Sequence, residues 1–218
     1  MDDRKSYGQF CALARALDRI GDRWTLLIVR ELLLGPARYG ELHRALPGLA
    51  TNLLALRLRQ LEADGLIQRA GDPAHRSHAI YELTDHGRAL EPIVLEMIRW
   101  GGRYMAAGPG TDIVDDRWAL LALRALLQTP HVTTPRGNLL VRCGDHELTV
   151  TIGPHGRHVL HPPSTATPRA VITGSLPELL ATLGFEDPST DISVEGDAPF
   201  LWQALRTHSE PRNAVSEQ

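Results

Sequence analysis

The chain has 218 residues, of which 43% are hydrophobic and 22% are charged, a composition typical of globular proteins and not of disordered or fibrous ones. It contains neither an apolar run long enough to cross a bilayer nor an apolar leader near its start, which predicts a cytoplasmic protein without membrane association. The two cysteines, Cys11 and Cys143, are too few for a disulfide framework.

The net charge of −3 hides a difference between the two halves of the chain. Residues 1–107 carry 15 basic and 13 acidic side chains, whereas residues 108–218 carry 8 and 13. Because lysine and arginine neutralise phosphate, we expect any nucleic-acid partner to bind the first half.

Apolar residues at helical spacing, interrupted by Gly-Pro pairs, predict four helices at the start of the chain. The fourth should be capped by Thr51 or its neighbour and should end at Gly65. Behind it, "LIQRA" and "HAIYEL" flank the turn "GDPAHRS" and predict a β-hairpin. Thr84 then caps one long helix over 85–105, which Pro92 should kink. The first four predicted helices are 10–20, 22–34, 39–46 and 51–64.

Small residues, glycine and proline at 108–111 predict a linker between domains 1–107 and 112–208, and 209–218 should form a flexible tail. In the second domain a helix precedes an antiparallel meander of three strands. A further strand then leads to a helix opened by a capping box, Ser175 with Glu178. The predicted fold class is α+β: a mostly helical domain with a hairpin, followed by an α+β domain with an antiparallel sheet.

The predicted helix over 51–64 has two unlike faces. At about 100° per residue, Leu54, Leu58 and Leu61 share one stripe, and Asn52 and Arg59 lie opposite. The opposite face as a whole holds an amide, two guanidinium groups and small or apolar side chains, types that can reach base edges and phosphates in a major groove. On an isolated helix a solvated face would be the simpler interpretation. The order helix, short helix, amphipathic helix and hairpin is that of a winged helix-turn-helix, and it favours DNA binding.

The motifs "RWT", "ELHRALPG", "RLRQLEADGL" and "YELTDHG", over residues 8–105, closely resemble the HxlR-type transcriptional regulators. The resemblance implies a homodimeric repressor or activator whose subunits meet through the first and last helices of the domain and bind a double-stranded DNA operator. It also implies structural roles for Arg23, Trp24 and Glu31. Leu56 stands where many relatives carry a polar residue. The DNA-binding residues expected from the resemblance and from the hairpin are Arg38, Thr51, Asn52, Ala55, Leu56, Arg57, Arg59, His75 and Arg76.

Cys11 aligns with a cysteine that some members of this family use to sense oxidants. The alternative, which the sequence favours, is a small buried side chain beside Phe10 and Leu13. Redox sensing through Cys11 therefore stays open as a second hypothesis.

The second domain more weakly resembles sterol carrier protein type two-like domains, in which sheet and helices enclose an apolar tunnel. That resemblance implies a small apolar effector, although ordinary core packing, or a module for protein interaction without ligand, would account for the same residues. Three histidines, His155, His158 and His161, fit no metal-ligand pattern, and no catalytic or cofactor motif is found, so we expect no metal, no cofactor and no enzyme. The candidate lining residues are Trp118, Leu121, Leu140, Leu148, Val150, Leu179, Leu183, Phe200 and Trp202.

Overall fold

A computed structural model of the chain describes residues 6–70, 79–105, 107–127, 136–153, 156–160, 162–184 and 191–205. Its contacts divide the chain into two compact units, Met1–Val94 and Leu95–Gln218. The predicted linker at 108–111 falls inside the second unit, so a domain boundary at that point stays a prediction. Within the described ranges, no helix is both long and apolar enough for a transmembrane span.

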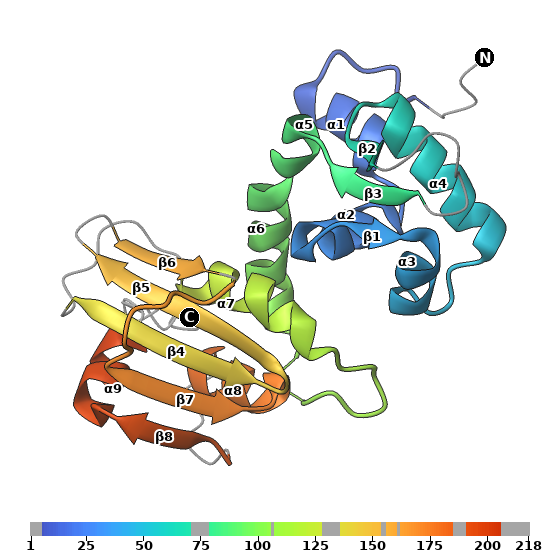
Figure 1. The fold of residues 1–218 in the computed structure, drawn as a ribbon. Coiled ribbons are helices and arrows are strands. Elements are labelled where there is room, and N and C mark those ends of the chain that lie inside the picture. Colours follow the sequence, from blue (N-terminus) through green and yellow to red (C-terminus); the bar gives the residue numbers. More distant parts are fainter. Residues whose placement is uncertain are drawn as a thin grey trace, which may run out of the picture. The chain divides into compact units, whose positions relative to one another are not determined.

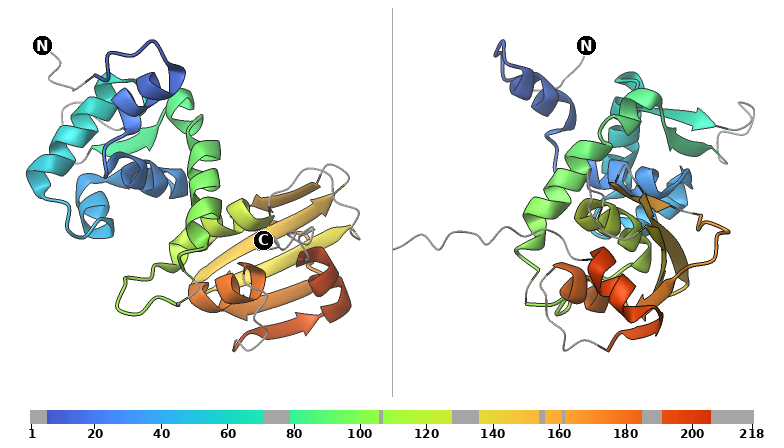
Figure 2. Two further views of the ribbon diagram at one scale, coloured as in Figure 1. Left: turned by 180° about the vertical axis from the view of Figure 1, so that it is seen from behind. Right: turned by 90° about the vertical axis from the view of Figure 1, so that its left-hand side faces the viewer.

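The first unit contains the predicted succession of short helices and a small sheet (Figures 1 and 2). Glycine and proline end the helices where expected, since neither Gly35-Pro36 nor Pro47-Gly48 can continue one. The elements are α1 (Ala12–Ile20), α2 (Thr25–Leu34), β1 (Ala37–Arg38), α3 (Tyr39–Ala45), α4 (Thr51–Ala63), β2 (Ile67–Ala70), β3 (Ile80–Leu83) and α5 (Asp85–Arg88).

The predicted hairpin is confirmed: β2 pairs antiparallel with β3, and Ile67 lies opposite Leu83 with both side chains buried. Strand β1 pairs with the other edge of β3 and makes the sheet order β1-β3-β2. The sequence did not predict β1, because a strand of two residues has no periodicity to read. The hairpin tip, with His75 and Arg76, lies outside the described residues.

The prediction of one long helix after Thr84 is wrong. The structure has two helices, α5 and α6 (Glu91–Gly102), separated at Ala89 and Leu90. Pro92 has no N–H to donate to the carbonyl of Arg88, and its ring would collide with that carbonyl in a continuous helix. The cap at Thr84 is confirmed, because its Oγ1 accepts the N–H of Gly87 at 3.1 Å and donates to the carbonyl of Gly65 at 2.6 Å.

The second unit contains a five-stranded sheet in the order β6-β5-β4-β7-β8. The predicted meander of β4, β5 and β6 is confirmed. The sheet is mixed and not wholly antiparallel, because the chain returns from β6 to the far side of β4 and there runs parallel to it as β7. The elements are η2 (Asp116–Trp118), α7 (Ala119–Leu127), β4 (Gly137–Cys143), β5 (His146–Gly153), β6 (Gly156–Leu160), β7 (Ala170–Gly174), α8 (Leu176–Gly184), β8 (Ser193–Gly196) and α9 (Ala198–Leu205).

Helices α7, α8 and α9 cover one face of this sheet, as both views in Figures 1 and 2 show. Alternate residues of β4, Leu139, Val141 and Cys143, are fully buried. One of the two bonds of the predicted capping box is present at the start of α8, where the N–H of Ser175 donates to Oε2 of Glu178 at 2.6 Å.

Gly87 offers a test of the packing between α5 and the hairpin. A Cβ at this position would lie 1.9 Å from the carbonyl oxygen of Leu66 and 3.0 Å from Cδ2 of Leu83. We expect Gly87→Ala to lower the free energy of unfolding by about 1–3 kcal/mol, the usual cost of overpacking. Urea unfolding followed by circular dichroism measures it.

Gly101→Ala is the matched control, since a Cβ there meets nothing within 4 Å in α6. It should leave stability unchanged or raise it by about 0.5–1 kcal/mol, because alanine favours a helix over glycine. Equal unfolding free energies for the two variants would contradict the close contact at Gly87.

Candidate nucleic-acid interface

One face of helix α4 is buried in the core of the first unit. The exposed fractions of Leu54, Leu58 and Leu61 are 0%, 1% and 2%. At the start of the helix, the hydroxyl of Tyr39 donates to the carbonyl of Thr51 at 2.7 Å. The N-cap residue is Ala50, the neighbour of Thr51, and its side chain makes no capping hydrogen bond; in the first turn, Oδ1 of Asn52 accepts the N–H of Leu53 at 2.9 Å. The leucines and Tyr39 thus set the orientation of α4.

The opposite side of α4 is open to solvent. Thr51, Asn52, Leu56 and Arg59 are exposed, and Ala55 is half-buried. Leu56 is 39% exposed. In the described part of the chain, the guanidinium of Arg59 has no hydrogen-bond or ion-pair partner. This face therefore offers an amide, a hydroxyl, an apolar side chain and a cation, which together can contact base edges and phosphates.

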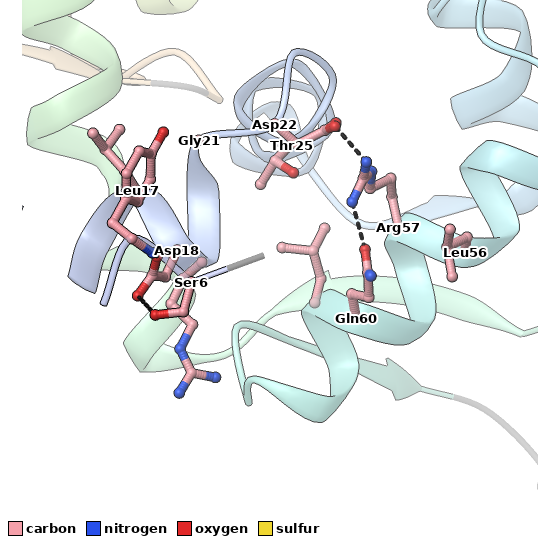
Figure 3. Close-up of a pocket in the computed structure, with 12 residues that line it drawn as sticks. Ser6, Leu17, Asp18, Gly21, Asp22, Thr25, Leu56, Arg57 and Gln60 are labelled. Carbon is pink, nitrogen blue, oxygen red and sulfur yellow. Dashed lines mark hydrogen bonds and ion pairs between the residues drawn. The ribbon is translucent and has the colours of Figure 1, made fainter. Parts of the chain in front are cut away.

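Arg57 differs from the other residues expected to bind DNA. Its Nη2 forms an ion pair with Asp22, and its Nη1 donates to Oε1 of Gln60 at 2.7 Å. Both bonds lie at a cavity of about 620 Å³ between α4 and the turn that joins α1 to α2 (Figure 3). A helical wheel shows only the direction of a side chain, so the partnership with Asp22, 35 residues earlier, could not be read from it.

The structure also describes the other residues of the first unit to which the sequence analysis gave DNA-binding or structural roles. Arg38 is exposed at the start of α3, where its backbone N–H donates to Oε2 of Glu41 at 2.6 Å. Glu31 is only 3% exposed and accepts from Nη2 of Arg30 at 2.6 Å. The guanidinium carbon of Arg23 lies 5.6 Å from the ring centroid of Trp24. These contacts agree with structural roles for Arg23, Trp24 and Glu31.

The two cysteines lie in opposite environments. Cys11 is exposed just before α1, so the expectation that it is buried is wrong. Its neighbours Phe10 and Leu13 are exposed as well. Apolar neighbours in the sequence therefore do not ensure that a residue is buried within its own chain. Cys143 is buried on β4, where burial, followed by the Asp116 carboxylate 3.6 Å from its sulfur, raises the pKa of its thiol to about 12.

The second unit has a largely apolar groove of about 320 Å³, formed by the segment after α6, by η2 and by the start of α8. Asp112 is the one charged residue among those that line it. The sequence analysis missed this groove except for Trp118, because it is built largely from loop residues without periodicity. The lining residues are Tyr104, Met105, Gly108, Pro109, Asp112, Ile113, Val114, Trp118, Leu176, Pro177, Leu180 and Ala181.

The other candidate lining residues lie elsewhere in the second unit. Most are buried at 2% exposure or less, as expected for ordinary core packing: Leu121, Leu148, Val150, Leu179 and Phe200. Leu140 is half-buried, Trp202 is 40% exposed on α9, and the side chain of Leu183 is outside the description. His158 is exposed on β6, while His155 and His161 lie outside the described residues.

Comparison with known proteins finds relatives of the first half of the chain. The model of the HxlR-like helix-turn-helix family matches residues 19–109. The uncharacterised HTH-type transcriptional regulator sll1512 of Synechocystis is 38% identical over 98 residues, which are 45% of this chain and 73% of that protein. YvaP of Bacillus subtilis, likewise an uncharacterised HTH-type transcriptional regulator, is 38% identical over 91 residues, 42% of this chain and 84% of its own length.

Two solved structures are also similar. The protein PA1607 is 37% identical; the match covers 63% of this chain and 87% of PA1607, with a TM-score of 0.43. The redox regulator HypR in its reduced form is 35% identical. The match covers 44% of this chain and 96% of HypR, with a TM-score of 0.42. On the sequence match over residues 19–109 and the identity to these regulators, the chain belongs to the HxlR-like helix-turn-helix family of transcriptional regulators.

Proposed function

We propose that the protein is a homodimeric regulator that reads its DNA operator with the exposed face of α4 and responds to a small apolar effector bound by its second unit. The observation that carries the DNA part is the contrast across α4: buried leucines lie on one side, and exposed Asn52, Leu56 and Arg59 lie on the other, with no partner for Arg59 among the described residues. Such a regulator would act in the cytoplasm, beside the chromosome.

Each exposed residue of α4 suits a different contact. Arg59 can reach a phosphate or a guanine edge, and Asn52 can pair with adenine. Leu56 can contact only apolar groups, and in a major groove the apolar group is the thymine methyl. Arg38, at the start of α3, would contact the backbone, as would His75 and Arg76 on the hairpin.

Exposed apolar side chains support the proposal of a homodimer. Phe10 and Leu13 at α1 are 105% and 67% exposed, and Met97 and Trp100 on α6 are 52% and 57% exposed. Met97 and Trp100 are spaced by about one helical turn and so lie on one side of α6. Exposed aromatic and methionine side chains are enriched at protein interfaces, and the family resemblance assigns dimerisation to these same helices.

Variants of Arg59 and Leu56 test the DNA contacts in different ways. Arg59→Ala should weaken binding to every duplex and reduce the slope of log K against log salt by about one, because one phosphate contact is lost. Leu56→Ala should keep the salt slope and change the preferred base at one position of each half-site. Fluorescence anisotropy at several salt concentrations measures both, on a duplex that the wild-type protein selects from a random pool.

Arg142→Ala is the control for removal of an exposed arginine, since Arg142 lies on β4 and pairs with Glu147. Its affinity and slope should equal those of the wild type. An unchanged affinity and slope for Arg59→Ala would remove Arg59 from the interface, and selection of no duplex by the wild-type protein would refute the proposed function.

The groove of the second unit supports the effector part of the proposal. Its volume of about 320 Å³ is at the lower end of the range for small-molecule sites. Since its charged lining residue is a carboxylate, Asp112, we expect a neutral or cationic apolar molecule and not a fatty acid. The effector would regulate binding only if it prefers one geometry of the dimer.

Three naphthalene derivatives of matched size, an amine, an alcohol and a carboxylate, test this site. The amine and the alcohol should raise the melting temperature by mass action, and the carboxylate should not. Asp112→Asn should lower the affinity for the amine by about two- to fivefold, the usual effect of losing an exposed ion pair, and leave the affinity for the alcohol unchanged.

Ala181→Trp should fill the groove and abolish the melting shifts, whereas Trp202→Ala, on α9 and away from the groove, should preserve them. If none of the three compounds stabilises the protein, the second unit is better explained as a ligand-free interaction module.

Redox sensing through Cys11 is a second candidate function, and the exposure of its side chain favours it. Diamide should lower the affinity for the selected duplex, and Cys11→Ser should abolish that response. Cys143→Ser should keep it, because the buried Cys143 thiol, with its pKa of about 12, stays protonated and inaccessible near neutral pH. An affinity that diamide does not change would exclude this function.

A further inference from the structure

Asp22, in the turn between α1 and α2, contacts two different helices. Its Oδ1 accepts the backbone N–H of Trp24 at 3.0 Å, which secures the start of α2. Its Oδ2 accepts from Nη2 of Arg57, in the middle of α4. One carboxylate therefore joins the first turn of α2 to the helix that carries the DNA-facing residues.

Both terminal nitrogens of the Arg57 guanidinium are bound within the protein. Nη2 is bound by Asp22 and Nη1 by Gln60, one turn later on α4, and Nε is buried with no acceptor among the residues that the structure describes. The side chain is only 21% exposed, and that of Asp22 is 28% exposed. Figure 3 shows Arg57 directed toward Asp22 and Gln60. An arginine that binds DNA must instead present these N–H groups to phosphate or guanine.

A second ion pair joins the same two regions. Arg19, at the end of α1, pairs with Asp64, which follows α4 and whose side chain is 4% exposed. The end of α1 and the turn after it thus hold α4 at two points, seven residues apart. With the hydroxyl of Tyr39 at the start of the helix, polar contacts secure α4 along its whole length.

We propose that Arg57 is a positioning residue and not a DNA contact: its ion pair with Asp22, the Asp22–Arg57 clamp, fixes α4 so that Asn52, Leu56 and Arg59 meet their bases. This inference rests on the proposed function, because it assigns a role within the same interface. It separates two arginines that stand two positions apart in the sequence, Arg57 as an internal support and Arg59 as the contact.

A double-mutant cycle tests the clamp. Arg57→Gln removes the cation, and Asp22→Asn removes the anion while keeping an oxygen that can accept the N–H of Trp24. Each should lower the affinity for the selected duplex by roughly three- to thirtyfold, and the double variant should lose no more than one single variant, since contacting pairs are not additive. The affinity for a random duplex and the salt slope should equal those of the wild type. Arg59→Ala, by contrast, should lower both.

A DNA contact by Arg57 would give the opposite pattern. Asp22→Asn would then leave affinity unchanged or raise it, and Arg57→Gln would reduce the salt slope by about one on every duplex, which would overturn the clamp. Urea unfolding of the same four proteins measures the coupling between Asp22 and Arg57 without DNA. Additive effects on unfolding would also overturn it, even if the wild-type protein selected no duplex and the proposed function had failed.

Discussion

The burial of three leucines on one side of α4 determines what the first unit presents to DNA. Leu54, Leu58 and Leu61 are exposed by no more than 2%, and burial of each contributes about 1.5–3 kcal/mol relative to exposure. Rotation of the helix by a single residue, about 100°, would bring these side chains into water. The face that carries Asn52 and Arg59 is therefore selected by the core, before any contact with DNA is made.

The sequence predicted most elements of both units because their signals are local. Glycine and proline end α2 and α3, and spacing marks the buried side of α4. The break before α6 was missed, although Pro92 was recognised, since the apolar pattern continues across it and hides where the helix stops. The parallel pairing of β7 with β4 was missed for another reason: strand order depends on the path of the chain and not on any one strand.

The candidate site was predictable to the same extent. The helical wheel of α4 predicted its exposed residues, Leu56 among them, and the family resemblance predicts that this face contacts DNA. The role of Arg57 could not be predicted, because it depends on a turn 35 residues earlier. The exposure of Cys11 could not be predicted either. Apolar neighbours in the sequence indicate a surface that is buried in some contact, but not whether that contact is made within the same chain. The groove around Asp112 is built largely from loop residues, which have no periodicity to read.

The hydroxyl of Thr84 has a geometric consequence for DNA binding. It donates to the carbonyl of Gly65, where the chain leaves α4, and accepts the N–H of Gly87 in α5. The end of α4 and the start of α5, which follows the hairpin, therefore share one anchor. If α4 and the hairpin bind DNA as proposed, this anchor would set the distance along the duplex between the bases that α4 contacts and the phosphates beside the base of the hairpin.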